Sequence, residues 1–129
     1  MTAQYDIALN LKAALNPLVS GRVYRLIFPQ PPAQPVWPAI RYTFISVDPE
    51  STWCGDGGEQ TANYRLQLDI VDSESKGFTS FNSLCNAVKS AIQSSLPNYF
   101  WESQQEDFDK ETKTLRMVLE YTIHLSSFD

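Results

Sequence analysis

The stretch A62-N-Y-R-L-Q-L-D-I70, together with the segment that follows it up to Ile92, decides the fold of this chain. From Ala62 to Ile70 apolar residues alternate with polar ones, so an extended segment has one apolar face and one solvated face. After the polar run 73–77 the spacing changes to three and four, in the residues Phe78, Phe81, Leu84, Cys85, Val88, Ala91 and Ile92. The pattern predicts a half-buried strand and then an amphipathic helix that covers a sheet.

The N-terminal third predicts a helix and two strands separated by prolines. A helix is expected over Ala3–Asn16, where the following proline ends the regular turns. A strand is expected at Arg22–Phe28, and then Pro29–Pro38, which holds five of the eight prolines and fits neither a sheet nor a helix. In the next predicted strand, Ala39–Asp48, the apolar positions change sides, which indicates a bulge or burial on both faces.

The remaining segments predict a loop and a hairpin. Pro49–Gln60 is polar and rich in glycine, and it is expected to be a loop. The strands Tyr99–Phe108 and Thr114–Ser126 are expected to form a hairpin about the turn 109–112. The order is therefore α-β-β-β-α-β-β, which predicts an α+β fold, a mainly antiparallel sheet with two helices packed on it. The length fits a single domain over residues 1–129.

Charge and hydropathy exclude several function classes. The net charge of −5 argues against a protein that grips nucleic-acid phosphates. No apolar run is long enough to cross a bilayer and the start lacks the basic residues of a signal peptide, so the chain is expected in the cytoplasm. Residues 1–47 carry four basic side chains against Asp6 alone, whereas 48–59 carry only acids: Asp48, Glu50, Asp56 and Glu59. Basic and acidic patches of this kind could meet on neighbouring copies.

No constellation of residues predicts catalysis or a cofactor. His124 is the only histidine and lies on the polar side of its strand. The acidic run 107–111 lacks the glycine of a calcium loop, and Gly55–Gly58 lacks the lysine of a phosphate-binding loop. Cys54 and Cys85 match neither a disulfide framework nor a metal site, so free thiols are expected. We therefore predict a protein that is not an enzyme and uses no metal or cofactor.

Large aromatic residues stand at positions that a core does not require. Trp53 lies in the glycine-rich loop and Trp37 among prolines, so each ring either tucks back locally or contacts a partner. Phe100 and Trp101 are adjacent in a predicted strand and face opposite sides. At least one of the two is therefore expected to be covered.

The residues also resemble a known family. Their order is G21-R-V-Y24, a proline-rich loop, P38-A-I-R-Y42, then Y64-R-L-Q-L-D-I70 and an amphipathic helix. This order is similar to that of the tail-completion proteins of long-tailed bacteriophages, which are related in architecture to tail terminators. The resemblance extends from the first helix through the second. This chain departs from the pattern in the high proline content of its first loop and in the acidic tip of its final hairpin.

The resemblance implies a structural role. Such proteins cap the tail tube as a ring, commonly of six subunits, stop its growth and present a docking surface for the filled head. The implied partners are other copies of the chain, the tail-tube protein and the head–tail connector proteins, while DNA passes through without specific binding and no membrane is involved. The implied location is the host cytoplasm during assembly, and later the head-proximal end of the tail in the virion. The family has no catalytic residues to transfer.

Combined with the charge pattern, the ring predicts roles for particular residues. The acids Asp48, Glu50, Asp56 and Glu59 are expected near the channel, because an acidic wall does not retain DNA. The alternative is that these acids only keep the subunit soluble. Three arginines, Arg22, Arg25 and Arg41, are expected at contacts between subunits. A head–tail connector or minor tail subunit, and less favourably a small α+β enzyme, remain as alternative functions.

Overall fold

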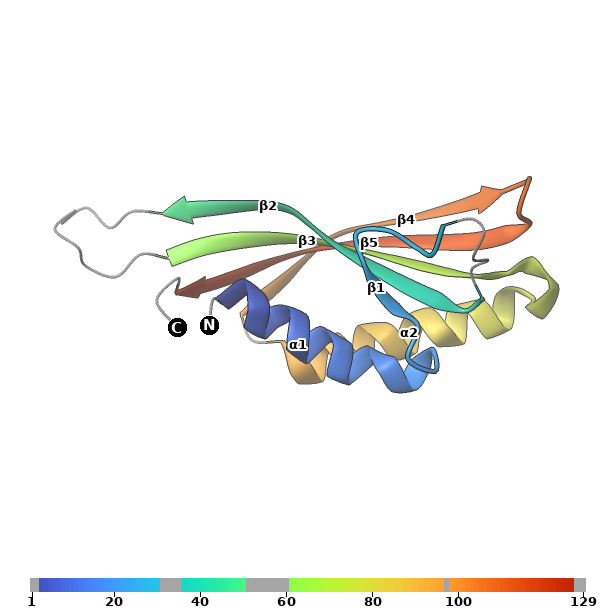
Figure 1. The fold of residues 1–129 in the computed structure, drawn as a ribbon, viewed down its shortest axis with the longest axis horizontal. Helices are drawn as coiled ribbons and strands as arrows, with labels where there is room; N and C mark the ends of the chain where they lie inside the picture. Colours follow the sequence, from blue (N-terminus) through green and yellow to red (C-terminus); the bar gives the residue numbers. More distant parts are fainter. Residues whose placement is uncertain (1–2, 31–35, 51–60, 97, 127–129) are drawn as a thin grey trace, which may run out of the picture.

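The computed structural model describes residues 3–30, 36–50, 61–96 and 98–126, and it confirms the α+β fold. The described strands form one sheet with the order β1-β2-β3-β5-β4, in which β1 is parallel to β2 and the other neighbours are antiparallel. Both helices lie on the same face of the sheet, side by side (Figure 1). The elements are α1 (Ala3–Leu15), η1 (Asn16–Leu18), β1 (Val23–Arg25), β2 (Ala39–Glu50), β3 (Thr61–Ser73), η2 (Glu74–Lys76), α2 (Phe78–Ser95), β4 (Tyr99–Asp109) and β5 (Thr114–Ser126).

The core lies between the helices and one face of the sheet. The alternating residues of β3 that the sequence placed on the apolar face are all buried. They meet matching rows from β2 and β5, because the register pairs Leu68 with Tyr42 on one side and with Leu119 on the other. Full burial of each large aliphatic side chain contributes about 1.5–3 kcal/mol. The helices contribute Ile7, Leu11, Leu15, Phe81, Cys85, Val88 and Ile92.

Two strand boundaries in the N-terminal half differ from the prediction. The strand expected over Arg22–Phe28 is only Val23–Arg25, because Leu26 has a φ of 72° and the Ile27 N–H donates to the Arg25 carbonyl. A residue in this left-handed region cannot continue a strand. Conversely, β2 continues to Glu50, so the start of the predicted loop at Pro49 is wrong. The reason is that the last residues of β2 pair with the beginning of β3.

The predicted bulge in β2 is confirmed. Phe44 pairs with Leu66 and Ser46 with Arg65, so Ile45 is the extra residue. The bulge explains why the apolar positions of the sequence change parity at this point. It keeps Val47, which pairs with Tyr64, on the helix side of the sheet.

Two predictions about aromatic residues are wrong. Phe78 was placed on the apolar stripe of the second helix, but it is 68% exposed because it is the first residue of α2 and lies beyond the core. Phe100 and Trp101 are 64% and 55% exposed, so neither is covered. Both residues stand at the start of the outer strand β4. On the helix side of the sheet, the Lys89 ammonium lies 4.8 Å from the centroid of the Trp101 ring. An outer strand thus keeps two large rings in water.

Candidate assembly surface

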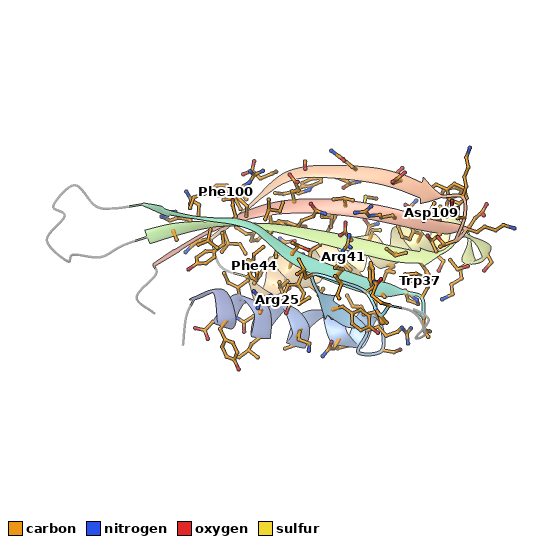
Figure 2. The ribbon with its side chains drawn as sticks, turned by 45° about the horizontal axis from the view of Figure 1, so that its top comes forward. Arg25, Trp37, Arg41, Phe44, Phe100 and Asp109 are labelled. Atoms are coloured by element: carbon orange, nitrogen blue, oxygen red, sulfur yellow. The ribbon has the colours of Figure 1, made fainter. Side chains whose placement is uncertain are left out.

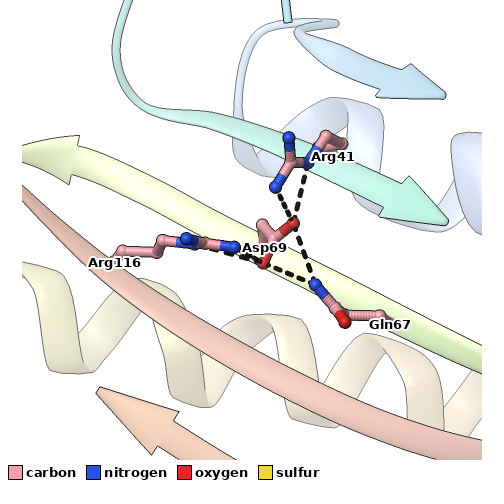
Figure 3. Close-up of polar contacts among 4 residues, drawn as sticks. All are labelled: Arg41, Gln67, Asp69 and Arg116. Carbon is pink, nitrogen blue, oxygen red and sulfur yellow. Dashed lines mark hydrogen bonds and ion pairs between the residues drawn. The ribbon is translucent and has the colours of Figure 1, made fainter. Parts of the chain in front are cut away.

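The face of the sheet opposite the helices is polar, but it contains a buried charge. Asp69 of β3 is fully buried although neither α1 nor α2 covers this face, because two guanidinium groups lie over it (Figure 3). Arg41 Nε donates to Asp69 Oδ2 at 2.7 Å, and Arg116 Nη2 donates to Asp69 Oδ1 at 2.9 Å. Gln67 Nε2 donates to the same carboxylate at 3.2 Å. Each carboxylate oxygen thus accepts charge-assisted hydrogen bonds from a different neighbouring strand.

This cluster of Arg41, Gln67, Asp69 and Arg116, here called the Asp69 cluster, was missed by the sequence reading. The alternation of β3 placed Asp69 among solvated residues. In fact Asp69 pairs with Arg41 on β2, while Arg116 lies diagonally opposite on β5. The sequence did contain one acid and two arginines in three predicted strands of one sheet. Recognising them as a cluster requires the register between those strands. Since the cluster holds two cations and one anion, it leaves a positive charge on the open face.

The structure brings two of the sequence-predicted residues, Trp37 and Arg41, together around one ring. The Trp37 ring lies edge-on to Phe28 at 5.3 Å, and the Arg41 guanidinium lies 5.1 Å from the centroid of the same ring. Trp37 is half-buried, so this ring does tuck back locally. Whether it also contacts a partner stays a prediction.

A groove of about 750 Å³ runs from this aromatic group to the tip of the final hairpin. One wall consists of Phe28, Gln30 and Trp37, and the other is the acidic tip 107–112. The floor includes Arg41 and Arg116 from the Asp69 cluster. Aromatic residues and arginines, which are enriched in protein–protein interfaces, thus line the groove together with the acidic tip.

The other predicted arginines lie apart from Arg41. Arg22 Nε donates to the Pro38 carbonyl at 2.8 Å and thereby ties the start of β1 to the start of β2. Arg25 is exposed and stacks over the Phe44 ring, 5.5 Å from its centroid, on the helix side. Arg25 and Arg41 stand on the neighbouring strands β1 and β2, close together in Figure 2, but their side chains lie on opposite faces of the sheet. The three arginines therefore form no single patch, and their role between subunits stays a prediction.

The predicted channel residues are only partly described. Asp48 is exposed in β2, and Ser46 Oγ donates to its carboxylate at 3.1 Å. Glu50 is the last residue of β2 and pairs with Thr61. Asp56, Glu59, Trp53 and Cys54 lie outside the described residues. A role of the four acids at a channel stays a prediction.

The described residues offer little for catalysis. No group of three or more His, Cys, Asp or Glu side chains among them could hold a metal ion. His124 Nδ1 lies 2.7 Å from Asn63 Oδ1 at the edge of the polar face, and Cys85 is a buried free thiol. Burial raises the pKa of Cys85 to about 11, which makes this thiol unreactive at neutral pH. None of the helices in the described ranges is long and apolar enough to cross a membrane.

Comparison with known proteins supports a role in assembly. A family model described as tail completion protein gp17 matches residues 8–126, nearly the whole chain. Among solved structures, a chain from the "Virion of native gene transfer agent (GTA) particle" is similar in fold, with a TM-score of 0.63. At 16% identity the likeness covers 97% of this chain and 95% of that one, and it shows the fold alone. No curated protein matches the sequence.

Proposed function

Because the chain belongs to the family of tail completion protein gp17, we propose that it caps the tail tube of a phage-like particle as a ring of identical subunits. The match over residues 8–126 is the observation that carries this proposal, and it agrees with the resemblance in the residues themselves. We propose that residues 1–129 act as one domain, that the ring has six copies, and that it ends tail growth and supports joining to the head. Its role is structural and not enzymatic.

The proposed partners are other copies of the chain, the tail-tube protein and the head–tail connector proteins. The groove beside the hairpin tip supports this proposal, since it combines exposed aromatic surface with charges of both signs. A second hollow of about 580 Å³ lies between the start of α2 and the hairpin, and Phe78 and Phe108 line it with exposed rings. Surfaces of this kind are typical of assembly subunits.

The channel proposal concerns the acids Asp48, Glu50, Asp56 and Glu59. DNA must pass the ring without being held, and a basic wall would retain it by neutralising phosphates. The exposure of Asp48 on β2 is compatible with an acidic lining. Replacing all four acids with lysine should slow DNA delivery while folding and ring assembly persist. Unchanged delivery would show that these acids do not line the channel.

The function is tested by deleting the gene from the genome that encodes it. The expected particles are filled heads and tails that do not join, or tubes of uncontrolled length, seen by electron microscopy. Supplying the wild-type protein in trans should restore joined particles. Normal infectious particles in the absence of the protein would contradict the assignment.

A further inference from the structure

The outer strand β4 leaves one edge of the sheet open. It pairs with β5 along its length, and no strand in the described ranges lies on its other side. Its unpaired backbone groups form a template on which a further strand can pair. Phe100 and Trp101 stand at the start of this edge, and both are more than half exposed.

The opposite edge of the sheet is also open over much of its length. β1 pairs with β2 only from Ile40 to Tyr42. From Thr43 to Glu50, no strand in the part of the chain that the structure describes covers the outer side of β2. Ile45 and Val47 in this free half are 42% and 40% exposed. Both edges thus combine unpaired backbone with exposed apolar side chains.

The backbone of the free half of β2 agrees with an edge. Ile40 and Tyr42 turn their backbone groups toward β1. The Ile40 N–H donates to the carbonyl of Arg22, just before β1, and the Tyr42 carbonyl accepts from the N–H of Leu26, just after β1. The extra residue Ile45 shifts the alternation of inward and outward backbone groups by one residue. After the bulge, the backbone groups of Val47 and Pro49 therefore point away from β3. Proline has no N–H to donate and occurs in sheets at edges. Pro49 therefore occupies a position suited to it, and Val47 offers an outward N–H and carbonyl.

The strand directions fix how two copies would join. β4 runs antiparallel to β5, β5 antiparallel to β3, and β3 antiparallel to β2, so β4 and β2 run in opposite directions within the sheet. In a ring whose rotation axis is parallel to the strands, the strands of every copy point the same way along the axis. β4 of one copy then meets β2 of the next copy as an antiparallel neighbour. The start of β4 and the end of β2 lie at the same end of the sheet (Figure 1).

We propose that copies of this chain join edge to edge, with the start of β4 in one copy pairing with the free half of β2 in the next. The register through the sheet places Phe100 level with Ser46, through Thr122 and Arg65, on the open face. Trp101 is level with Phe44 on the helix side in the same way. In this joint the rings of Phe100 and Trp101 lie against Ser46 and Phe44, next to the exposed side chains of Ile45 and Val47. This inference deepens the proposed ring and rests on it.

Charge supports a second copy as the occupant of this edge. Beyond Trp101, β4 carries four acids and no basic residue: Glu102, Glu106, Asp107 and Asp109. At the level of these acids, the outer side of β2 is already covered by β1. Arg22 directly precedes β1, and the exposed Arg25 is its last residue. The acidic half of β4 therefore lies beside basic side chains of the next copy. Figure 2 shows this separation, with Phe100 near one end of β4 and Asp109 at the other. Such complementary edges favour a head-to-tail contact over aggregation.

The proposal is tested with a pair of engineered cysteines, Ser46→Cys with Phe100→Cys, in a Cys54→Ser background. Opposed residues in an antiparallel pair have Cα atoms about 4.5–5.5 Å apart, which suits a disulfide. Mild oxidation of the assembled protein should give a ladder of covalent species up to the full ring. The matched control, Ser46→Cys with Asp109→Cys, places the second thiol at the wrong end of β4 and should give no ladder.

The outcomes separate this inference from the proposed function. An oligomer without the Ser46–Phe100 ladder, or with equal ladders for both pairs, overturns edge pairing and leaves the ring intact. A crosslink to the tail-tube protein in place of a second copy also overturns it. Absence of any oligomer, both in solution and in isolated tails, overturns the ring itself. As a second variant, Phe100→Asp should abolish the oligomer without lowering the melting temperature of the dissociated subunit, measured at low protein concentration, because the ring of Phe100 is 64% exposed.

Discussion

The two faces of the sheet are stabilised in different ways, as two adjacent residues of β3 show. Leu68 and Asp69 point to opposite faces, and both are fully buried. Leu68 is covered by apolar side chains beneath the helices, whereas Asp69 is covered by the two arginines that bind it. The helix-covered face depends on packed apolar area, whereas the open face holds an ionic cluster beside the buried side chains of Ala39 and Val71. Substitutions on the two faces test this difference.

The largest effect is expected on the helix-covered face. Leu68→Ala should lower the free energy of unfolding by about 3–5 kcal/mol, because it removes buried methyl groups and leaves a cavity between β3 and the helices. Urea unfolding followed by circular dichroism measures this loss. As a control, Leu9→Ala on α1 removes the same atoms from a side chain that is 46% exposed, and it should cost far less. Equal losses for the two variants would show that the core lies elsewhere.

The next effect is expected at the Asp69 cluster. Asp69→Ala leaves Arg41 and Arg116 facing each other without their shared carboxylate, and it should lower the free energy of unfolding by about 3 kcal/mol. The matched control is Asp48→Ala, which removes an exposed acid from β2. A loss below about 1 kcal/mol for Asp69→Ala would mean that the arginines are stable without it, and the two faces would then differ less than we infer.

The alternation of the sequence was sufficient to predict the helix-covered face. Spacing alone identified the buried row of β3 and most of the stripe of α2, because burial against helices leaves a periodic trace. The open face left no such trace. The burial of Asp69 depends on the register that puts Arg41 opposite it, and no local pattern encodes that register.

The ends of the strands escaped prediction for a similar reason. β1 stops early because Leu26 adopts a left-handed conformation that no glycine signals. A proline such as Pro49 argues against a strand unless the strand is known to lie at the edge of a sheet. At least one of the rings of Phe100 and Trp101 was expected to be covered, because the position of β4 at the outside of the sheet could not be seen in its sequence.

A smaller effect concerns alkaline pH and the helix-covered face. Burial, together with the neighbouring Tyr99, raises the pKa of Tyr121 from 10.0 to about 12. Above the unfolded pKa the unfolded chain loses this proton while the folded chain keeps it, so stability falls as the pH rises from about 10 toward about 12. A shift of this size corresponds to about 3 kcal/mol at most. Tyr121→Phe should remove that part of the decline in urea unfolding at rising pH. An unchanged decline would assign it to other groups.

The smallest effect is expected at Arg65, and it decides whether the open face is one network or a single cluster. Arg65 lies 3.9 Å from Glu120 on the same face as Asp69, but its side chain is 49% exposed. Glu120 keeps a second partner, since Ser103 Oγ donates to it at 3.2 Å. Exposed pairs of this kind contribute about 0.2–1 kcal/mol, so Arg65→Ala should change the free energy of unfolding by less than about 0.5 kcal/mol. The effect should vanish at high salt, because solvent ions screen exposed charges. A loss above about 1 kcal/mol that persists at high salt would mean that the charges of this face act together. The buried carboxylate of Asp69 would then be the centre of an ionic layer rather than an isolated exception.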